Sequence, residues 1–263
     1  MNVLDFGFGS IEAQLWQIMF LSIRCGAALM AAPMIGGTAV PPQLRILLSL
    51  VLGYFIAAWV PLPPAPAMMS IAAVLAVLQE VAVGLMLGFV LQLAFAIPLI
   101  AAEQISGTMG LAIATSIDPA SGAQSGALGT FFGLVLSLLF YATGAHLLWF
   151  ELLIESYRLL PAGSFAFGAW RAQSVVMFMG YGLATAAAIA LPVVLVLLLV
   201  QIVTGLIARS APSLNLFALG LPAGVLAGIA AMIIALPVMV GQMRGVIEAT
   251  LEQSSALIAG EAP

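Results

Sequence analysis

Ionisable side chains inside apolar stretches are the residues of this sequence with the clearest capacity for chemistry. Arg24, Glu80 and Glu103 each lie within or at the end of a long hydrophobic segment. Insertion of an ionised side chain at membrane depth costs about 2.5–3.5 kcal/mol of free energy on insertion scales. Such a side chain therefore indicates either a function or a pairing partner of opposite charge. Arg24 is either a charge that lines a pore or one half of a pair with a carboxylate in a protein–protein contact.

Glu80 follows Gln79, and a glutamate at this depth suggests a proton relay as one interpretation. A relay normally needs several acids within reach, and this segment offers no second acid before Glu103. We therefore expect Glu80 to serve in structural pairing at a subunit contact. Arg24, Glu80 and Glu103 together form the set of polar groups for which we predict pairing inside the hydrophobic segments.

Catalytic and metal chemistry have little support in the sequence. His146 is the only histidine and Cys25 the only cysteine, so neither a zinc site nor a disulfide framework can be built. We expect His146 to hydrogen-bond among packed helices and Cys25 to act as a small apolar residue. Ala120-Ser121-Gly122 resembles the nucleophile segment of intramembrane serine proteases, with His146 as the candidate base. Those enzymes take serine and histidine from well-separated helices, whereas Ser121 and His146 lie only 25 residues apart. We predict a protein that is not an enzyme and has no cofactor or metal.

Hydrophobic helices must position these residues. The chain has 263 residues with only 6% charged, whereas soluble domains average about 25%. This ratio excludes a soluble enzyme, a nucleic-acid binder and a disordered chain. A membrane-spanning helix needs about 20 apolar residues, and several charge-free runs are long enough. We predict an all-α protein with about six hydrophobic segments: Ala13–Pro33, Leu44–Val60, Ser70–Ala102, Leu128–Ile154, Gln173–Ala208 and Leu216–Met243.

The third and fifth segments are longer than one bilayer crossing, since the third alone would give roughly 50 Å of helix. Such segments tilt, protrude or break, and glycine and proline mark the weak points. The expected weak points are Gly84, Gly88, Pro98, Pro192, Pro222 and Pro237. Gly84 and Gly88 also form a Gly-x-x-x-Gly face that lets a second helix approach closely, either in this chain or in a partner.

The ends and loops carry weaker signals. The acidic start of the chain lacks the basic region of a signal peptide, so we expect the first segment to be retained. In either orientation of the chain in the membrane, the loop arginines divide two against three between the two sides. Their distribution therefore predicts no topology. Residues 106–126 are apolar but rich in Gly, Ser, Thr and Ala, a composition typical of a loop packed inside protein.

An ordered set of landmarks runs along most of the chain: Arg24, Ala32-Pro33, Val40-Pro41, Arg45, Gln79-Glu80-x₃-Gly84-x₃-Gly88, Glu103-x₅-Met109-Gly110, Asp118-Pro119, Gly144-x-His146, Leu160-Pro161-x-Gly163, Leu191-Pro192, Gly205-x₃-Arg209-x-Ala211-Pro212, Asn215-x-Phe217 and Gly220-x-Pro222. Taken in order, these landmarks resemble the FliR/SctT family of type III secretion export proteins over about residues 11–243. Thr108 and Leu221 depart mildly from the family pattern, which often has Gln and Phe there.

The resemblance implies a channel subunit with a FliP-like part (about residues 1–172) joined to a FliQ-like part (about 173–263). It implies assembly with FliP-like and FliQ-like subunits into a helical hetero-oligomer in the bacterial inner membrane, at the flagellar basal body. FlhB-like and FlhA-like export components, exported unfolded proteins and membrane lipid are the other implied partners, and nucleic acid is not one. In such assemblies many hydrophobic helices pack against partner subunits outside the bilayer plane, which accounts for the overlong segments.

The resemblance also implies a pore plug in the loop after the third segment, at about Gly107–Gly122. The residues carried over are Gly107, Met109, Gly110, Leu111, Ile113, Ile117, Asp118 and Pro119. Small and methyl-bearing side chains suit a seal, because apolar constrictions exclude water and ions. The rival hypotheses are an injectisome protein of the same family, which serves virulence secretion, and a stand-alone secondary transporter with six segments.

Overall fold

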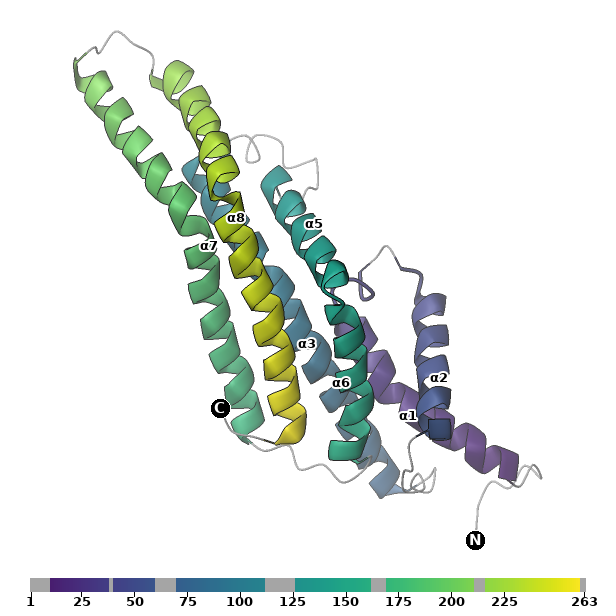
Figure 1. Cartoon of the computed structure of the whole chain (residues 1–263). Coiled ribbons are helices and arrows are strands. Elements are labelled where there is room, and N and C mark those ends of the chain that lie inside the picture. Colours follow the sequence, from purple (N-terminus) through teal and green to yellow (C-terminus); the bar gives the residue numbers. More distant parts are fainter. Residues whose placement is uncertain are drawn as a thin grey trace. The chain divides into compact units, whose positions relative to one another are not determined.

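The computed structural model describes residues 10–37, 40–59, 70–111, 126–161, 169–210 and 216–260, and every regular element within them is an α-helix (Figure 1). This confirms the predicted fold class. The helices are α1 (Ser10–Ala31), α2 (Pro42–Trp59), α3 (Ile71–Thr108), α5 (Ala127–Ala142), α6 (Ala145–Leu159), α7 (Ala169–Ser210) and α8 (Leu216–Ala259).

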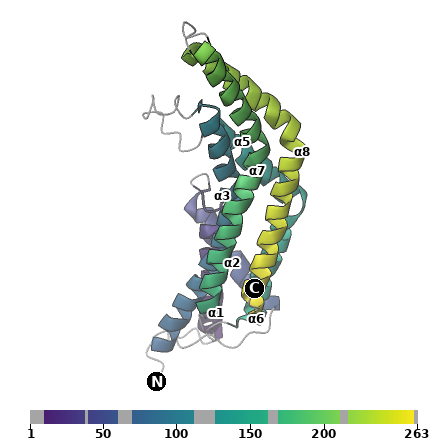
Figure 2. The ribbon, with the colours of Figure 1, turned by 90° about the vertical axis from the view of Figure 1, so that its left-hand side faces the viewer.

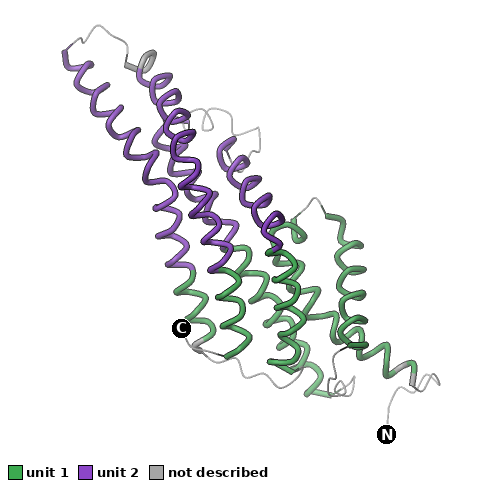
Figure 3. The backbone as a smooth tube through the Cα atoms, viewed as in Figure 1, with its two compact units in different colours: residues 1–93, 145–178, 250–263 green, residues 94–144, 179–249 purple. Residues whose placement is uncertain are grey.

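The chain forms two compact units (Figure 3). Unit 1 consists of residues 1–93, 145–178 and 250–263, and unit 2 of residues 94–144 and 179–249. The long helices α3, α7 and α8 contribute residues to both units. Within unit 2, α7 and α8 lie side by side in both ribbon views (Figures 1 and 2). The predicted division into a FliP-like part and a FliQ-like part near residue 172 describes similarity to other subunits. It stays a prediction.

Helices α3 and α8 do not break at the expected weak points. Pro98 lies inside the 38 residues of α3, and Pro222 and Pro237 lie inside the 44 residues of α8, without ending either helix. Pro192 likewise lies inside α7. A proline removes one helical hydrogen bond, but neighbouring groups and small local adjustments in apolar bundles can compensate for it. Helix α8 also continues past the predicted end at Met243, because helix formation does not stop where charged residues begin.

The two glycines of α3 serve helix packing and do not break the helix. A Cβ added at Gly84 would collide with the backbone oxygen of Arg24 and would lie 2.8 Å from the Cβ of Ala27. A Cβ added at Gly88 would lie 2.6 Å from the Cβ of Ala31. Helices α1 and α3 of unit 1 are therefore in backbone contact, which a small-residue face allows.

A break occurs instead inside the predicted fourth segment. Helix α5 ends at Ala142, α6 begins at Ala145, and the chain bends by 69° between them. The NH group of Thr143 donates to Leu139, and Gly144 has a positive φ of 73°. Glycine adopts this left-handed conformation readily, so it ends the first helix and redirects the chain.

The structure also gives a number of candidate membrane spans. Four helices of the described residues are long and apolar enough to cross a membrane (α2, α3, α7 and α8), or five when α5 and α6 count as one bent span. Helix α1 is not among them, so not every predicted hydrophobic segment is a candidate span. Its Gln14, Gln17 and Arg24 lower its hydropathy. The finding agrees with a polytopic membrane protein.

Candidate functional site

A buried ion pair in unit 1 joins two of the residues singled out by the sequence. Arg24 of α1 donates from Nε to Oε2 of Glu80 on α3 at 2.8 Å, and from Nη2 to Oε1 at 2.9 Å. Both side chains have an exposed fraction of 0%. Two parallel hydrogen bonds between a guanidinium and a carboxylate are stronger and more directional than a single neutral one.

The other donors of Arg24 bind the end of α6. Nη1 donates to the carbonyl oxygen of Ser156 at 2.7 Å and to its Oγ at 3.0 Å, and Nη2 donates to the carbonyl oxygen of Leu160 at 2.8 Å. A guanidinium has five N–H groups, and these contacts use all of them. The last carbonyls of a helix are electron-rich and lack a full set of helical partners. Arg24 therefore caps α6 while it neutralises Glu80.

Tyr157 completes this buried group. Its ring centroid lies 4.1 Å from Cζ of Arg24, and its hydroxyl donates to the carbonyl oxygen of Leu21. Cys25 Sγ lies 3.4 Å from the same hydroxyl. We call Arg24, Glu80, Ser156, Tyr157 and Leu160 the Arg24 cluster. It ties α1, α3 and α6 together and presents no open position to a substrate.

The remaining polar residues lie elsewhere. Glu103 is exposed on the unit 2 part of α3, so the structure does not bring it to Arg24 and Glu80. The ion pair itself lies within this chain, whereas the sequence interpretation placed the pairing of Glu80 at a subunit contact. His146 lies in the first turn of α6, and Ser121 lies outside the described residues.

The predicted plug begins at the described end of α3. Gly107, Met109, Gly110 and Leu111 are described, whereas Ile113, Ile117, Asp118 and Pro119 lie outside the described residues. The NH of Met109 donates to Ile105 at 2.9 Å, and the NH of Gly110 donates to Gly107 at 3.1 Å. Gly110 has a φ of 81°, so a left-handed glycine ends α3 at this point.

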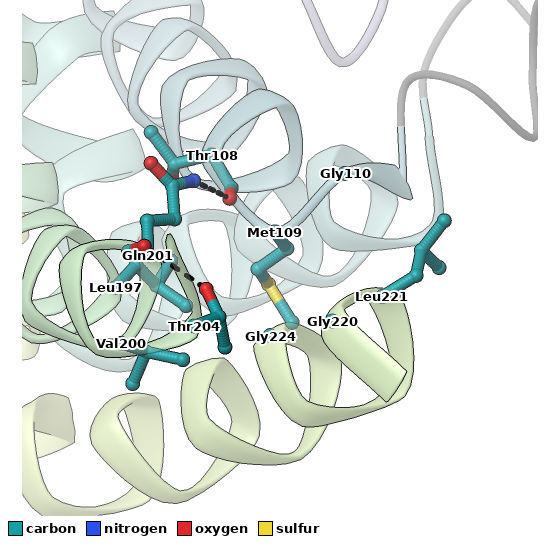
Figure 4. A pocket seen from close by; sticks show the side chains of 10 residues that line it. All are labelled: Thr108, Met109, Gly110, Leu197, Val200, Gln201, Thr204, Gly220, Leu221 and Gly224. Carbon is teal, nitrogen blue, oxygen red and sulfur yellow. Dashed lines mark hydrogen bonds between the residues drawn. The ribbon is translucent and has the colours of Figure 1, made fainter. Parts of the chain in front are cut away.

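The side chain of Met109 is buried and points toward α8 (Figure 4). It packs on Gly228, whereas the backbone carbonyl oxygen of Met109 lies near Gly224. A Cβ added at Gly228 would lie 2.7 Å from both Cγ and Cε of Met109, and one added at Gly224 would lie 3.4 Å from the Met109 carbonyl oxygen. Across from them, Gln201 of α7 donates from Nε2 to the carbonyl oxygen of Thr108 at 2.9 Å. We call Gly224, Gly228 and Gln201 the Met109 seat.

A cavity of about 280 Å³ adjoins this seat within unit 2. Apolar and small side chains line most of it, including Leu197, Val200 and Leu221, and Thr204 and Gln201 supply the polar part. Sequence reasoning missed the seat, although one signal was available. Gly220, Gly224 and Gly228 recur every four residues and so line one face of α8, as Gly84 and Gly88 do on α3.

Comparison with known proteins assigns the family. The sequence model described as bacterial export proteins, family 1, matches residues 15–250. The chain belongs to this family of bacterial export proteins. The resemblance drawn from the ordered sequence landmarks is thereby confirmed. The members of this family are structural, non-enzymatic components of the export apparatus.

The relatives agree with the family assignment. The flagellar biosynthetic protein FliR of Escherichia coli (strain K12) is 32% identical over 223 residues, which are 82% of this chain and 83% of the relative. The protein of the same name from Bacillus subtilis (strain 168) is 29% identical over 245 residues, 92% of this chain and 94% of the relative. The surface presentation of antigens protein SpaR of Shigella flexneri is 32% identical over 143 residues, 54% of this chain and 55% of the relative.

This bacterial export protein leaves large apolar helix faces uncovered. In the candidate spans, 17% of the most apolar window of α2, 28% of that of α7 and 22% of that of α8 are buried, against 61% for α3. Exposed side chains such as Trp59, Leu199 and Ile234 lie on these faces. Lipid or other apolar protein must cover these faces, because large contiguous apolar patches are unfavourable in contact with water.

Proposed function

We propose that this chain is the structural and gating subunit of a type III protein export channel in the bacterial cell membrane. It contributes the pore plug through which unfolded substrates pass when the plug is displaced. The observation that carries the proposal is the family match over residues 15–250, together with relatives named flagellar biosynthetic protein over more than four fifths of this chain.

The uncovered helix faces support a role as one subunit of a larger assembly. The expected partners are FliP-like and FliQ-like subunits, arranged with this chain in a helical hetero-oligomer. FlhB-like and FlhA-like components would act beside it, and lipid would cover what the subunits leave exposed. The low burial of α7 and α8 fits the FliQ-like interpretation of residues 173–263, because those helices need neighbours to cover them.

The plug assignment to Gly107–Gly122 draws support from the chemistry of the residues. Met109, Leu111, Ile113 and Ile117 carry flexible or branched apolar side chains, and only small residues (Gly, Ala, Thr and Ser) separate them. A narrow passage lined in this way excludes water and therefore ions. These four side chains carry no fixed charge that would hold an unfolded substrate, and Asp118 is the one charged residue of the plug. The energy for export comes from other components.

A flagellar system is favoured over an injectisome. The FliR relatives from Escherichia coli and Bacillus subtilis align over most of this chain, whereas the SpaR relatives align over about half. Expression in a flagellated bacterium whose own FliR-like gene is deleted tests the choice. Restored swimming supports the flagellar assignment, and restored secretion only in an injectisome mutant would replace it with the virulence system.

Co-expression tests the role as an assembly subunit. The chain is produced alone and together with FliP-like and FliQ-like proteins, and one FliP-like copy carries the affinity tag. We expect a stable complex only from the combined expression. Recovery of this chain alone as an active homo-oligomer that transports a small solute would overturn the proposal in favour of a secondary transporter.

A deletion tests the plug. Removing Gly110–Ser116 should leave the complex assembled, as measured by co-purification, and should make the membrane permeable to small ions. An assembled complex with unchanged ion permeability would reject the plug assignment and leave the subunit role intact.

A further inference from the structure

We infer that Met109 is a latch that holds the end of α3 against α7 and α8 and thereby keeps the export path closed. The inference rests on the proposed function, because it gives a mechanism to the start of the plug. The latch consists only of described residues: Met109 and Thr108 on α3, the two glycines of the Met109 seat on α8, and Gln201 on α7.

The fit between Met109 and Gly228 is specific. The exposed fraction of Met109 is 3%, although this residue follows the last residue of its helix. Its Cγ, Sδ and Cε all lie within 2.8 Å of the position where a Cβ at residue 228 would stand. Only glycine leaves room for the methionine side chain in this position, so an added methyl group would force the side chain to shift.

The Thr108 contact holds the backbone from the other side. Gln201 donates to the Thr108 carbonyl oxygen, which is one of the last carbonyls of α3 and has no partner within a continuing helix. The left-handed Gly110 directly follows. The chain therefore leaves α3 in a direction fixed by one apolar contact and one hydrogen bond, at the residue where the predicted plug begins.

The same contacts are suited to release. Methionine has three rotatable bonds and an adaptable thioether, so it can leave a pocket without backbone strain. The cavity of about 280 Å³ beside the seat gives the side chain room to move. The hydrogen bond of Gln201 is neutral and this residue is exposed, so water can replace the bond when it breaks.

The decisive variant is Gly228→Ala in the co-expressed complex. The three atoms nearest to the added methyl group are Cγ, Sδ and Cε of the flexible Met109 side chain and none is a backbone atom, so the complex should still assemble. Loss of a buried methionine contact shifts a local equilibrium by about tenfold or more. We expect the passive permeability of the membrane to small ions to rise by about that factor.

Gly220→Ala is the matched control. It makes the same chemical change on the same helix and beside the same cavity, but a Cβ there meets nothing within 4 Å. Its ion permeability should equal that of the unaltered protein. Met109→Ala should leak as Gly228→Ala does, and the double variant should leak no more than either, because both changes remove one contact.

The outcomes separate the latch from the proposed function. If deletion of Gly110–Ser116 leaks while Gly228→Ala and Met109→Ala both stay sealed, the latch is wrong and the plug stands. If the deletion stays sealed as well, the plug itself is wrong. If Gly220→Ala leaks as much as Gly228→Ala, the effect is not specific to the seat and the latch is overturned.

A disulfide crosslink tests the same inference by locking the contact between residues 109 and 228 in place of removing it. It also provides a test if the Gly228→Ala complex fails to assemble. The position of Cγ of Met109 is where a cysteine sulfur at residue 109 would lie, 2.7 Å from a Cβ at residue 228. Met109→Cys with Gly228→Cys, in a Cys25→Ala background, should form a disulfide under an added oxidant. Export should stop on oxidation and return on reduction, and full export with the bond formed would overturn the latch.

Discussion

The Arg24 cluster and the Met109 seat hold helices together by opposite means. The cluster uses a fully buried charge pair and three further hydrogen bonds to backbone and hydroxyl oxygens. The seat uses one flexible apolar side chain against glycine and one neutral hydrogen bond.

The difference separates a permanent joint from a reversible one. Removing one partner of a buried ion pair strands a charge in an apolar interior, so the cluster cannot open and close at low cost. Removing methionine from a glycine seat exposes apolar surface only. We therefore assign the cluster to assembly and the seat to gating, and the following predictions test that assignment from the largest expected effect to the smallest.

Arg24→Met should destabilise the chain most. It leaves the Glu80 carboxylate buried without its guanidinium partner and removes the Arg24 donor from the carbonyl oxygen of Leu160. The carbonyl oxygen of Ser156 also loses its Arg24 donor but keeps the N–H of Leu160. The expected loss is about 3–5 kcal/mol, measured as a lower thermal midpoint and a lower yield of the co-purified complex. Arg158→Met is the control, because Arg158 pairs with Glu155 on an exposed surface and should contribute at most about 1 kcal/mol. Equal losses in the two variants would contradict the role of the cluster.

Glu80→Gln should destabilise less, by about 1.5–3 kcal/mol, because the amide keeps the shape and one acceptor but loses the charge. We expect reduced assembly with an unchanged pH dependence of export in the complex that does form. A variant that assembles normally but loses pH-dependent export would restore the proton-relay interpretation of Glu80.

Gly84→Ala should loosen the contact between α1 and α3 near the cluster. The new methyl group would collide with the backbone oxygen of Arg24, which cannot move aside as a side chain can. Overpacking of this kind costs about 1–3 kcal/mol, seen as a lower thermal midpoint of the complex. Gly107→Ala, on the same helix with nothing within 4 Å, should leave the midpoint unchanged or slightly raised. If both variants are equally stable, backbone contact at Gly84 is not required.

Gln201→Leu should have the smallest effect on stability, about 0.5–1.5 kcal/mol, because it removes one neutral hydrogen bond at an exposed site. We expect normal assembly and a modest rise in ion permeability, smaller than that of Gly228→Ala. Thr204→Val provides the comparison, since the Thr204 hydroxyl donates only to Gln201 within its own helix turn. A large loss of assembly in Gln201→Leu would show that Gln201 serves assembly, as the Arg24 cluster does, and would contradict its assignment to gating.

Much of the helical architecture follows from local sequence properties. Charge-free runs predicted α3, α7 and most of α8, because an apolar stretch of this length has its backbone satisfied only as a helix in lipid or apolar protein. The break at Gly144 was missed, since hydropathy continues across it and a left-handed glycine leaves no mark in composition. Conversely, no break occurs at the weak points Pro98, Pro222 and Pro237, because packing retains a helix that an isolated proline would disrupt.

The sequence by itself determined the class of protein, its family and the set of residues with chemical capacity. Its low charge and the order of its Gly, Pro, Arg and Glu landmarks are properties of the chain that need no folding to be read. Tertiary structure alone decided that Arg24 meets Glu80, which lies 56 positions away, and that Met109 meets Gly228. Such pairs depend on how helices cross, and crossing is set by the sum of many weak contacts along both surfaces.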